Sequence, residues 1–309
     1  MKLRNVLISV FSIFIAAQTF AAGVPSFNKN AENKDISYAI SKIQARQAQM
    51  TYESSSLIKA VKSNNVSAVK KILAARSVNL EATDERGHTA LMFATNKDCN
   101  TEILNMLLKA NANVLTKDMD GRTALIHAAR NNNLYAFTYL LRADSEPDAV
   151  DDSGFSPLMY AVANNNSVMV NNLLSGYRAK TEPLLYGKTC ALNIAIDNNN
   201  AEILSALING GANIFYKGVY QMSPLMYAAY VGRPQMLAIL IKAGGKVNEH
   251  NDQDYDRTPL IYAAARGSKE CIEILLQNKA DKYSADSEGN TPFDYAVKTG
   301  DLSVSNLLR

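Results

Sequence analysis

The chain has 309 residues, of which 47% are hydrophobic and 20% charged, and its formal net charge is +3. A charge this close to zero excludes a general electrostatic attraction to nucleic acid or to anionic membranes. We therefore expect no nucleic-acid partner.

The first 21 residues have the pattern of a secretory signal peptide. A stretch at 2–4 with two basic residues precedes an apolar run at 6–17, and small residues follow. The run is shorter than the roughly 20 residues that span a bilayer, so we expect cleavage after Ala21 or Ala22 and no stable membrane insertion of the mature chain. This signal predicts a periplasmic location in a bacterium, with secretion from the cell as the alternative.

Residues 22–53 are predicted to be a linker that contains a short helix. Positions 23–35 combine Gly and Pro with many Asn, Lys and Glu residues, a composition typical of flexible chain. Isoleucines at positions 36, 40 and 43 recur at helical spacing and favour a helix at about 35–50. We expect this helix to cover the first unit of the domain that follows; a free recognition helix is the alternative.

Residues 54–309 repeat with a period of 33 to 35 residues. The clearest marker is one alanine per unit, with similar neighbours in most copies. A period this regular indicates stacked copies of one supersecondary unit rather than a single globular core. The marker alanines are Ala60, Ala94, Ala128, Ala161, Ala195, Ala228, Ala263 and Ala296.

Each unit is predicted to begin with a short helix. A Thr or Ser, often followed by Pro, stands ahead of the marker; its hydroxyl accepts from a free backbone N–H, and Pro at the first helical position gives up no needed donor. Four residues after the marker, seven units carry only Asn or Gly, which most readily adopt the left-handed conformation that ends a helix. The Ala94 unit has one extra residue here, so we expect a different turn. The helix-ending residues are Asn64, Asn132, Asn165, Asn199, Gly232, Gly267 and Gly300.

A second helix and a tight turn complete each unit. An apolar pair such as Leu140-Leu141 follows the marker by twelve and thirteen residues in most copies and is typical of the buried stripe of a helix. In four units an Asp stands three residues ahead of a Gly, as a tight turn requires. These residues are Asp84, Asp118, Asp151 and Asp286.

This order of helices and turns resembles the ankyrin repeat family. The family signature Thr-Pro-Leu-His-x-Ala is matched at Thr258–Ala263 and Ser223–Ala228, with the His replaced in every unit. The resemblance implies an all-α solenoid of about eight helix-turn-helix units with atypical terminal units. It also implies a partner protein bound on the concave face, which the turn tips and the first helices form.

The three cysteines fall in different units, so we expect no intramolecular disulfide. Stacked units are roughly 10 Å apart, which puts Cys99 and Cys190 about 30 Å from each other, whereas a disulfide needs Cα atoms within about 7 Å. Cys271 lies on a predicted buried stripe, and Cys190 takes the place of a capping hydroxyl. A thiol-based redox or protective function is an alternative that depends on Cys99 in its irregular turn.

The sequence predicts a binding protein rather than an enzyme. His88, His127 and His250 show no metal-ligand spacing, and neither do the cysteines. His127 replaces an aromatic residue of other units and is expected to pack in a helix, while His88 is expected at a solvated turn tip. The Gly-Lys-Thr triplet at 187–189 lacks the earlier Gly of a phosphate-binding loop. We predict no metal, no cofactor and a monomer.

Large side chains occupy the turn tips of four consecutive units, where small polar residues are normal. A row of exposed aromatic rings is typical of a protein interface, because Tyr supplies a large contact area at low entropic cost. The alternative is that each ring packs on the neighbouring unit. The predicted partner-binding residues are Phe155, Tyr186, Tyr220, Met222, Tyr255, Arg122 and Arg257.

Together these features predict a protein-interaction scaffold. In one interpretation it is a periplasmic adaptor or protective partner of another protein. In the other it is a secreted effector that binds a host protein. Fractionation of the producing cells distinguishes the two.

Overall fold

The computed structural model describes residues 41–42, 55–75, 78–181 and 190–309. The chain divides into two compact units, residues 1–52 and 53–309. Of the first, only Ser41 and Lys42 are described, and both are helical. The predicted signal peptide, the linker and the rest of the predicted capping helix lie outside the described residues.

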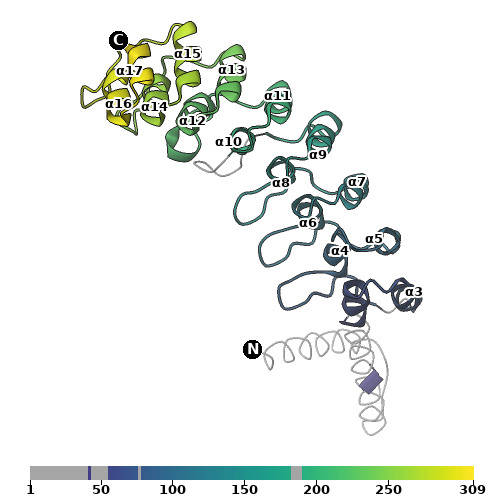
Figure 1. The fold of residues 1–309 in the computed structure, drawn as a ribbon. Coiled ribbons are helices and arrows are strands. Elements are labelled where there is room, and N and C mark those ends of the chain that lie inside the picture. The colour runs from purple at the N-terminus through teal and green to yellow at the C-terminus, as the bar shows by residue number, and fades with distance from the viewer. Residues whose placement is uncertain (1–40, 43–54, 76–77, 182–189) are drawn as a thin grey trace, which may run out of the picture. The chain divides into compact units, whose positions relative to one another are not determined.

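In the described part of residues 53–309, the helices form eight pairs, one for each predicted repeat, and we number the repeats 1 to 8 in chain order. The pairs stack side by side in an arc, with the first helix of each pair on the inner side and the second on the outer side (Figure 1). The inner helices are residues 55–62, α4 (Ala90–Phe93), α6 (Ala124–Arg130), α8 (Pro157–Ala163), α10 (Ala191–Asp197), α12 (Pro224–Val231), α14 (Pro259–Arg266) and α16 (Pro292–Thr299). The outer helices are α3 (Val66–Ala74), α5 (Thr101–Lys109), α7 (Leu134–Arg142), α9 (Ser167–Asn171) continued by the π-helical segment η2 (Asn172–Gly176), α11 (Ala201–Asn209), α13 (Pro234–Lys242), α15 (Lys269–Gln277) and α17 (Leu302–Leu308).

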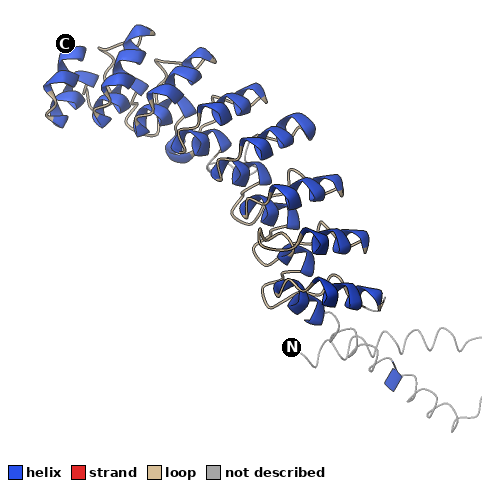
Figure 2. Cartoon of the chain, turned by 45° about the vertical axis from the view of Figure 1, so that its right-hand side comes forward, coloured by secondary structure: helices blue, strands red, loops and turns tan. Residues whose placement is uncertain are grey.

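This arrangement confirms the predicted all-α solenoid. Where the connections from an outer helix to the next inner helix are fully described, they are long turns without regular strands, and they project on the inner side of the arc (Figure 2). Among the described residues, no helix combines the length and the apolar character that crossing a membrane requires.

The inner helices begin at the predicted hydroxyl residues. The side-chain oxygen of Thr258, for example, accepts a hydrogen bond from the backbone N–H of Ile261 at 3.3 Å, so that it satisfies one of the free donors of the helix start. In repeat 5 the same position is Cys190, whose side chain makes no capping hydrogen bond. The predicted substitution of a thiol for a capping hydroxyl is therefore confirmed.

The inner helices also end as predicted. All seven Asn and Gly residues have positive φ, from 52° at Asn132 to 76° at Gly300. In repeat 2, residues 96–100 contain no positive φ, which agrees with the different turn expected there.

Runs of three asparagines link neighbouring repeats, and we call these links the asparagine ladder. In the first run, the Asn131 amide donates to the Asn96 side chain of the preceding repeat at 3.0 Å. Asn132 takes the left-handed conformation, and Asn133 caps α7 by accepting from the N–H of Ala136 at 3.1 Å. The second run repeats the scheme and adds a direct bond to the first, from the Asn166 amide to Oδ1 of Asn132 at 2.6 Å. The runs thus have structural roles in both turn geometry and stacking.

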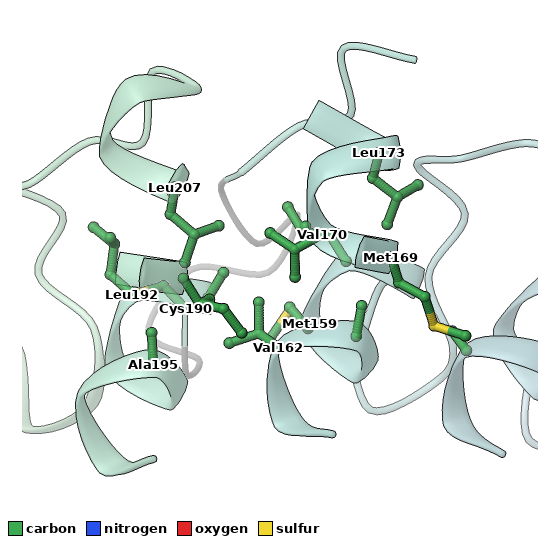
Figure 3. Packing of buried hydrophobic residues seen from close by; sticks show 14 of the residues in the cluster. Met159, Val162, Met169, Val170, Leu173, Cys190, Leu192, Ala195 and Leu207 are labelled. Atoms are coloured by element: carbon green, nitrogen blue, oxygen red, sulfur yellow. The ribbon is translucent and has the colours of Figure 1, made fainter. Parts of the chain in front are cut away.

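The core is a continuous apolar layer between the inner and outer helices. The marker alanines are all buried. Their small side chains let neighbouring inner helices approach closely, because a larger residue there would hold the backbones apart. Figure 3 shows the side chains of Val162 of α8, Val170 of α9 and Leu207 of α11 in the layer between the inner and outer helices of two neighbouring repeats. Burial of this layer is shared between repeats, so each repeat depends on its neighbours for stability.

Candidate protein-binding surface

An aspartate organises most of the turns ahead of the inner helices. Oδ1 of Asp286 accepts from the backbone N–H groups of Glu288 at 3.0 Å and Asn290 at 2.9 Å, while Oδ2 accepts from the Tyr295 hydroxyl at 2.7 Å. Burial raises the pKa of Asp286, but the hydrogen bonds from Tyr295 and from these backbone groups outweigh it and hold the pKa below its ordinary value. Asp151 makes the same contacts. These carboxylates therefore stabilise turns, as the recurring pattern predicts.

The turns of repeats 6 and 7 have a different backbone. Tyr220 and Gln221 both have positive φ, 57° and 55°, and so do Tyr255 and Asp256, 51° and 58°. Each left-handed residue other than Gly costs roughly 1–2 kcal/mol, and such strain tends to cluster at functional sites. The strained turns leave the two tyrosines 67% and 52% exposed. Both rings thus stand in solvent at the tips of consecutive repeats.

A third exposed tyrosine joins these tips on the surface of the inner helices. Tyr230 of α12 is 46% exposed, and its ring centroid lies 6.4 Å from that of Tyr220. A hollow lined by Tyr220, Tyr230 and Arg257 lies between the two turns, and the Arg257 guanidinium lies 5.0 Å from the ring centroid of Tyr255. We call Tyr220, Tyr230 and Tyr255 the tyrosine patch.

Charged groups lie next to the patch. A second hollow on the other side of Tyr230 is lined by Asp197, Arg233 and Arg266. Tyr262 also lines it, and Oδ2 of Asp254 accepts from the Tyr262 hydroxyl at 2.7 Å. Burial and this hydrogen bond raise the pKa of Tyr262, so its hydroxyl remains a donor.

The aromatic and apolar residues predicted to bind a partner have different positions. Tyr220 and Tyr255 are exposed at turn tips, as described above. Met222 is only 3% exposed and packs against the core, so it is not an exposed tip residue as expected, but it also lines the hollow between the two turns. Phe155 is half-buried, with its ring centroid 5.3 Å from that of Tyr160 in the same repeat. Tyr186 lies outside the described residues.

The two predicted arginines connect repeats. Nε of Arg122 lies 3.5 Å from Oδ2 of Asp151 in the next repeat. Arg257 pairs with Asp254 at 3.2 Å, and its Nε donates to the Tyr295 hydroxyl of the next repeat at 3.2 Å. Of the two, Arg257 also borders the tyrosine patch.

Sequence reasoning missed Tyr230. It stands two residues after its marker alanine, where other repeats have residues such as Arg130, Ala163 or Lys298. The prediction considered large side chains only at the turn tips. The aromatic residue at this position, which is small or polar in the other repeats, is the sequence signal that indicates an exposed ring on the inner helix.

None of the three cysteines takes part in a disulfide, and two of the thiols are fully enclosed. Cys190 and Cys271 are buried, and Cys99 is half-buried. Burial raises the pKa of the Cys99 thiol, which disfavours the reactive thiolate. This environment lends no support to the redox alternative.

The structure places together three residues that spacing along the chain did not associate: His88, Asp118 and His127. The His88 side chain is only 19% exposed, so the expectation of a solvated ring was wrong. His127 is buried in α6, as predicted, and burial lowers its pKa more than the hydrogen bond to Asp118 raises it. The prediction of no metal ligands was based on spacing along the sequence. It therefore could not detect residues that come together through contacts between neighbouring repeats.

Comparison with known proteins agrees with the fold. A family model for ankyrin repeats in three copies matches residues 29–118, 96–183, 158–251 and 243–309. The "Ankyrin repeat protein nuc-2" of Neurospora crassa is 25% identical over 80% of this chain, which spans 23% of that protein. The "Putative ankyrin repeat protein FPV223" of fowlpox virus is 31% identical over 38% of this chain and 80% of its own length.

A solved structure shows the same architecture. The ankyrin repeat domain of Bcl-3, described as a unique member of the IkappaB protein family, superposes with a TM-score of 0.62 at 23% identity and covers 72% of this chain and 97% of its own. Ankyrin repeats indicate a protein–protein interaction scaffold. Since the family model matches most of its length, the chain belongs to the ankyrin repeat family.

Proposed function

We propose that the chain is a non-enzymatic scaffold that binds a partner protein through the tyrosine patch of repeats 6 and 7. The observation that carries this proposal is the pair of strained turns that hold Tyr220 and Tyr255 in solvent. A turn made only to connect helices has no need of this strain, because an Asp-x-x-Gly turn such as that at Asp286 connects the same elements without it. Exposed tyrosines are frequent anchors of protein interfaces.

The charges near the patch favour a partner segment that carries a carboxylate. Two arginines, Arg233 and Arg266, line the hollow beside Tyr230 together with a single acidic residue, Asp197. An extended segment with an acidic side chain flanked by apolar residues would pair with the arginines while its apolar groups contact the rings.

The proposed setting is the bacterial periplasm, where the protein acts as an adaptor or protective partner. Its support is the N-terminal sequence: the basic start, the short apolar run and the small residues near Ala21. N-terminal sequencing of the exported protein should yield Ala22 or Gly23 as first residue, and cell fractionation should place it in the periplasm. Recovery in the medium or in a host cell would favour the secreted effector instead.

The binding surface is tested by single substitutions. Tyr220→Ala and Tyr230→Ala should each weaken binding of the partner recovered by affinity purification by about 30-fold, since truncation of a central aromatic anchor costs about 2 kcal/mol or more. Tyr283→Ala is the matched control, because Tyr283 is 75% exposed in the turn after α15 and lies outside the patch. It should bind like the parent protein.

Thermal stability decides the alternative role of the rings. The patch variants should melt within a few degrees of the parent protein, as expected for exposed positions. If they lose stability while their affinity for the partner is unchanged, the rings serve the repeat stack and the proposed surface is wrong.

A further inference from the structure

Two histidines from neighbouring repeats meet at one buried carboxylate. His88 stands in the turn before α4, Asp118 in the turn before α6, and His127 within α6. The side chain of Asp118 has no exposed surface. Because the stack places equivalent turns side by side, residues far apart in sequence share one small volume.

The geometry around Asp118 suits a metal ion. Its Oδ2 lies 2.7 Å from Nε2 of His127 and 3.4 Å from Nε2 of His88, and the three candidate ligand atoms all lie within 4.8 Å of one another. Ligands bound to zinc at about 2.0–2.1 Å in a tetrahedron are about 3.3 Å apart, so small adjustments would bring the three atoms to coordination distance. Oδ1 is held by the backbone N–H groups of Asp120 at 2.9 Å and Arg122 at 2.8 Å, which leaves Oδ2 to face the histidines.

A second carboxylate orients His88. Oδ2 of Asp84 lies 3.3 Å from Nδ1 of His88, and its Oδ1 accepts from the backbone N–H groups of Arg86 and His88, both at 2.9 Å. With Nδ1 donating to Asp84, the lone pair of Nε2 faces Asp118. Histidines that bind metals commonly have such a partner on the other ring nitrogen. Lys62 also pairs with Asp84, at 3.5 Å, and does not contact the three ligand atoms in any described interaction.

At the positions of His88 and His127, other repeats have residues that are not histidine. Where repeat 3 has His127, repeats 4 and 8 have Tyr160 and Tyr295, each of which donates to the turn aspartate at 2.7 Å. The turn alone is thus satisfied by a tyrosine. Where repeat 2 has His88, repeat 8 has Asn290. One tyrosine hydroxyl is enough to satisfy the aspartate of an equivalent turn, so the second imidazole at Asp118 is not required to stabilise the turn.

We propose that His88, Asp118 and His127 bind one divalent transition-metal ion of the zinc class, with Asp84 positioning His88. Two imidazoles and a carboxylate are ligands that zinc accepts, and three protein ligands leave a fourth position for water. The partly exposed His88 ring provides the side from which the ion enters. The site lies in repeats 2 and 3 and is independent of the partner proposed for repeats 6 and 7.

The test is zinc binding by the mature protein after treatment with a chelator and removal of the chelator. Isothermal titration should show one Zn²⁺ per chain, zinc should raise the melting temperature, and Co²⁺ in its place should give the visible absorption of a nitrogen–oxygen site. His127→Tyr is the decisive variant, because the tyrosines at this position in repeats 4 and 8 donate to the equivalent aspartates of their own turns. His88→Asn is the second variant, because repeat 8 has asparagine, Asn290, at the position of His88.

Both variants should fold like the metal-free parent protein and bind zinc at least about 100-fold more weakly. Asp84→Asn keeps an oxygen for the turn but loses the acceptor for His88, so it should weaken zinc binding by about 10- to 100-fold. His250→Asn is the control, since His250 is exposed in repeat 7 and should contribute nothing.

Two results would overturn the proposal. One is a parent protein that neither binds zinc in the titration nor melts at a higher temperature with it. The other is a His88→Asn or His127→Tyr variant that folds and binds zinc as the parent does. If either variant does not fold, the other decides. Since the measurements need no partner, failure of the tyrosine patch leaves them unaffected.

Discussion

Substitution of Asn132 separates two contributions to the stability of a repeat junction. This residue has φ of 52°, a conformation that is strained for alanine, and its Oδ1 accepts from the Asn166 amide of the next repeat at 2.6 Å. Asn132→Ala removes the hydrogen bond and introduces the strain. Asn132→Gly removes the hydrogen bond only, because glycine adopts this conformation freely.

The two variants should therefore differ by a predictable amount. Loss of the hydrogen bond costs about 1 kcal/mol, and alanine in the left-handed region costs about 1 kcal/mol more. We expect the free energy of unfolding to fall by about 2 kcal/mol in Asn132→Ala and by about 1 kcal/mol in Asn132→Gly.

Urea unfolding followed by circular dichroism and by tyrosine fluorescence measures these differences, provided that the two probes report coincident transitions. The double variant Asn132→Gly with Asn166→Ala isolates the hydrogen bond, since its effect should be smaller than the sum of the single effects. Equal losses for the Ala and Gly variants would refute the argument from backbone strain. No loss in either would refute the stabilising role of the ladder.

Two further predictions concern the turns. Gly267→Ala should cost about 1 kcal/mol in thermal unfolding from backbone strain alone, because φ is 72° and an added Cβ would meet only Thr299 Cγ2, at 3.9 Å; an unchanged melting temperature would contradict this. The pKa of Asp286 is held below its ordinary value in the folded state, so its contribution to stability is present above the unfolded pKa of about 3.9 and is lost as the pH falls through the lower folded pKa. Unfolding measured from about pH 6 to about pH 3 should show a weaker loss of stability in Asp286→Asn than in the parent protein, and identical pH profiles would count against the carboxylate.

The sequence was sufficient for the repeat architecture because each of its signals acts within one repeat. A hydroxyl at Thr258 caps its own helix, and Asn132 ends its own helix whatever surrounds it. Because eight copies can be aligned, a unit that departs from the pattern, such as the one with Cys190 at the capping position, does not obscure the repeat. Such local signals are independent of the way in which repeats stack, so the helix boundaries could be predicted without a structure.

The candidate sites depend on contacts between repeats, and here prediction was less complete. Met222 is two residues from the exposed Tyr220, yet it is buried because the strained turn directs the two side chains to different environments. The cluster of His88 and His127 arises only when adjacent turns are placed side by side. Comparing equivalent positions of neighbouring repeats, rather than spacing along the chain, would have found it.

The change from asparagine to glycine at the repeat junctions has a mechanical consequence. Up to Asn199, the helix-ending residues belong to runs whose side chains bond the neighbouring repeat, whereas Gly232, Gly267 and Gly300 have no side chain with which to do so. Other side chains connect the repeats at these junctions, as Arg257 does when it donates to the Tyr295 hydroxyl. The tyrosine patch therefore lies where the links between repeats come from the turns and not from the helix ends, so a partner that contacts these turns also contacts the residues that hold the last repeats together.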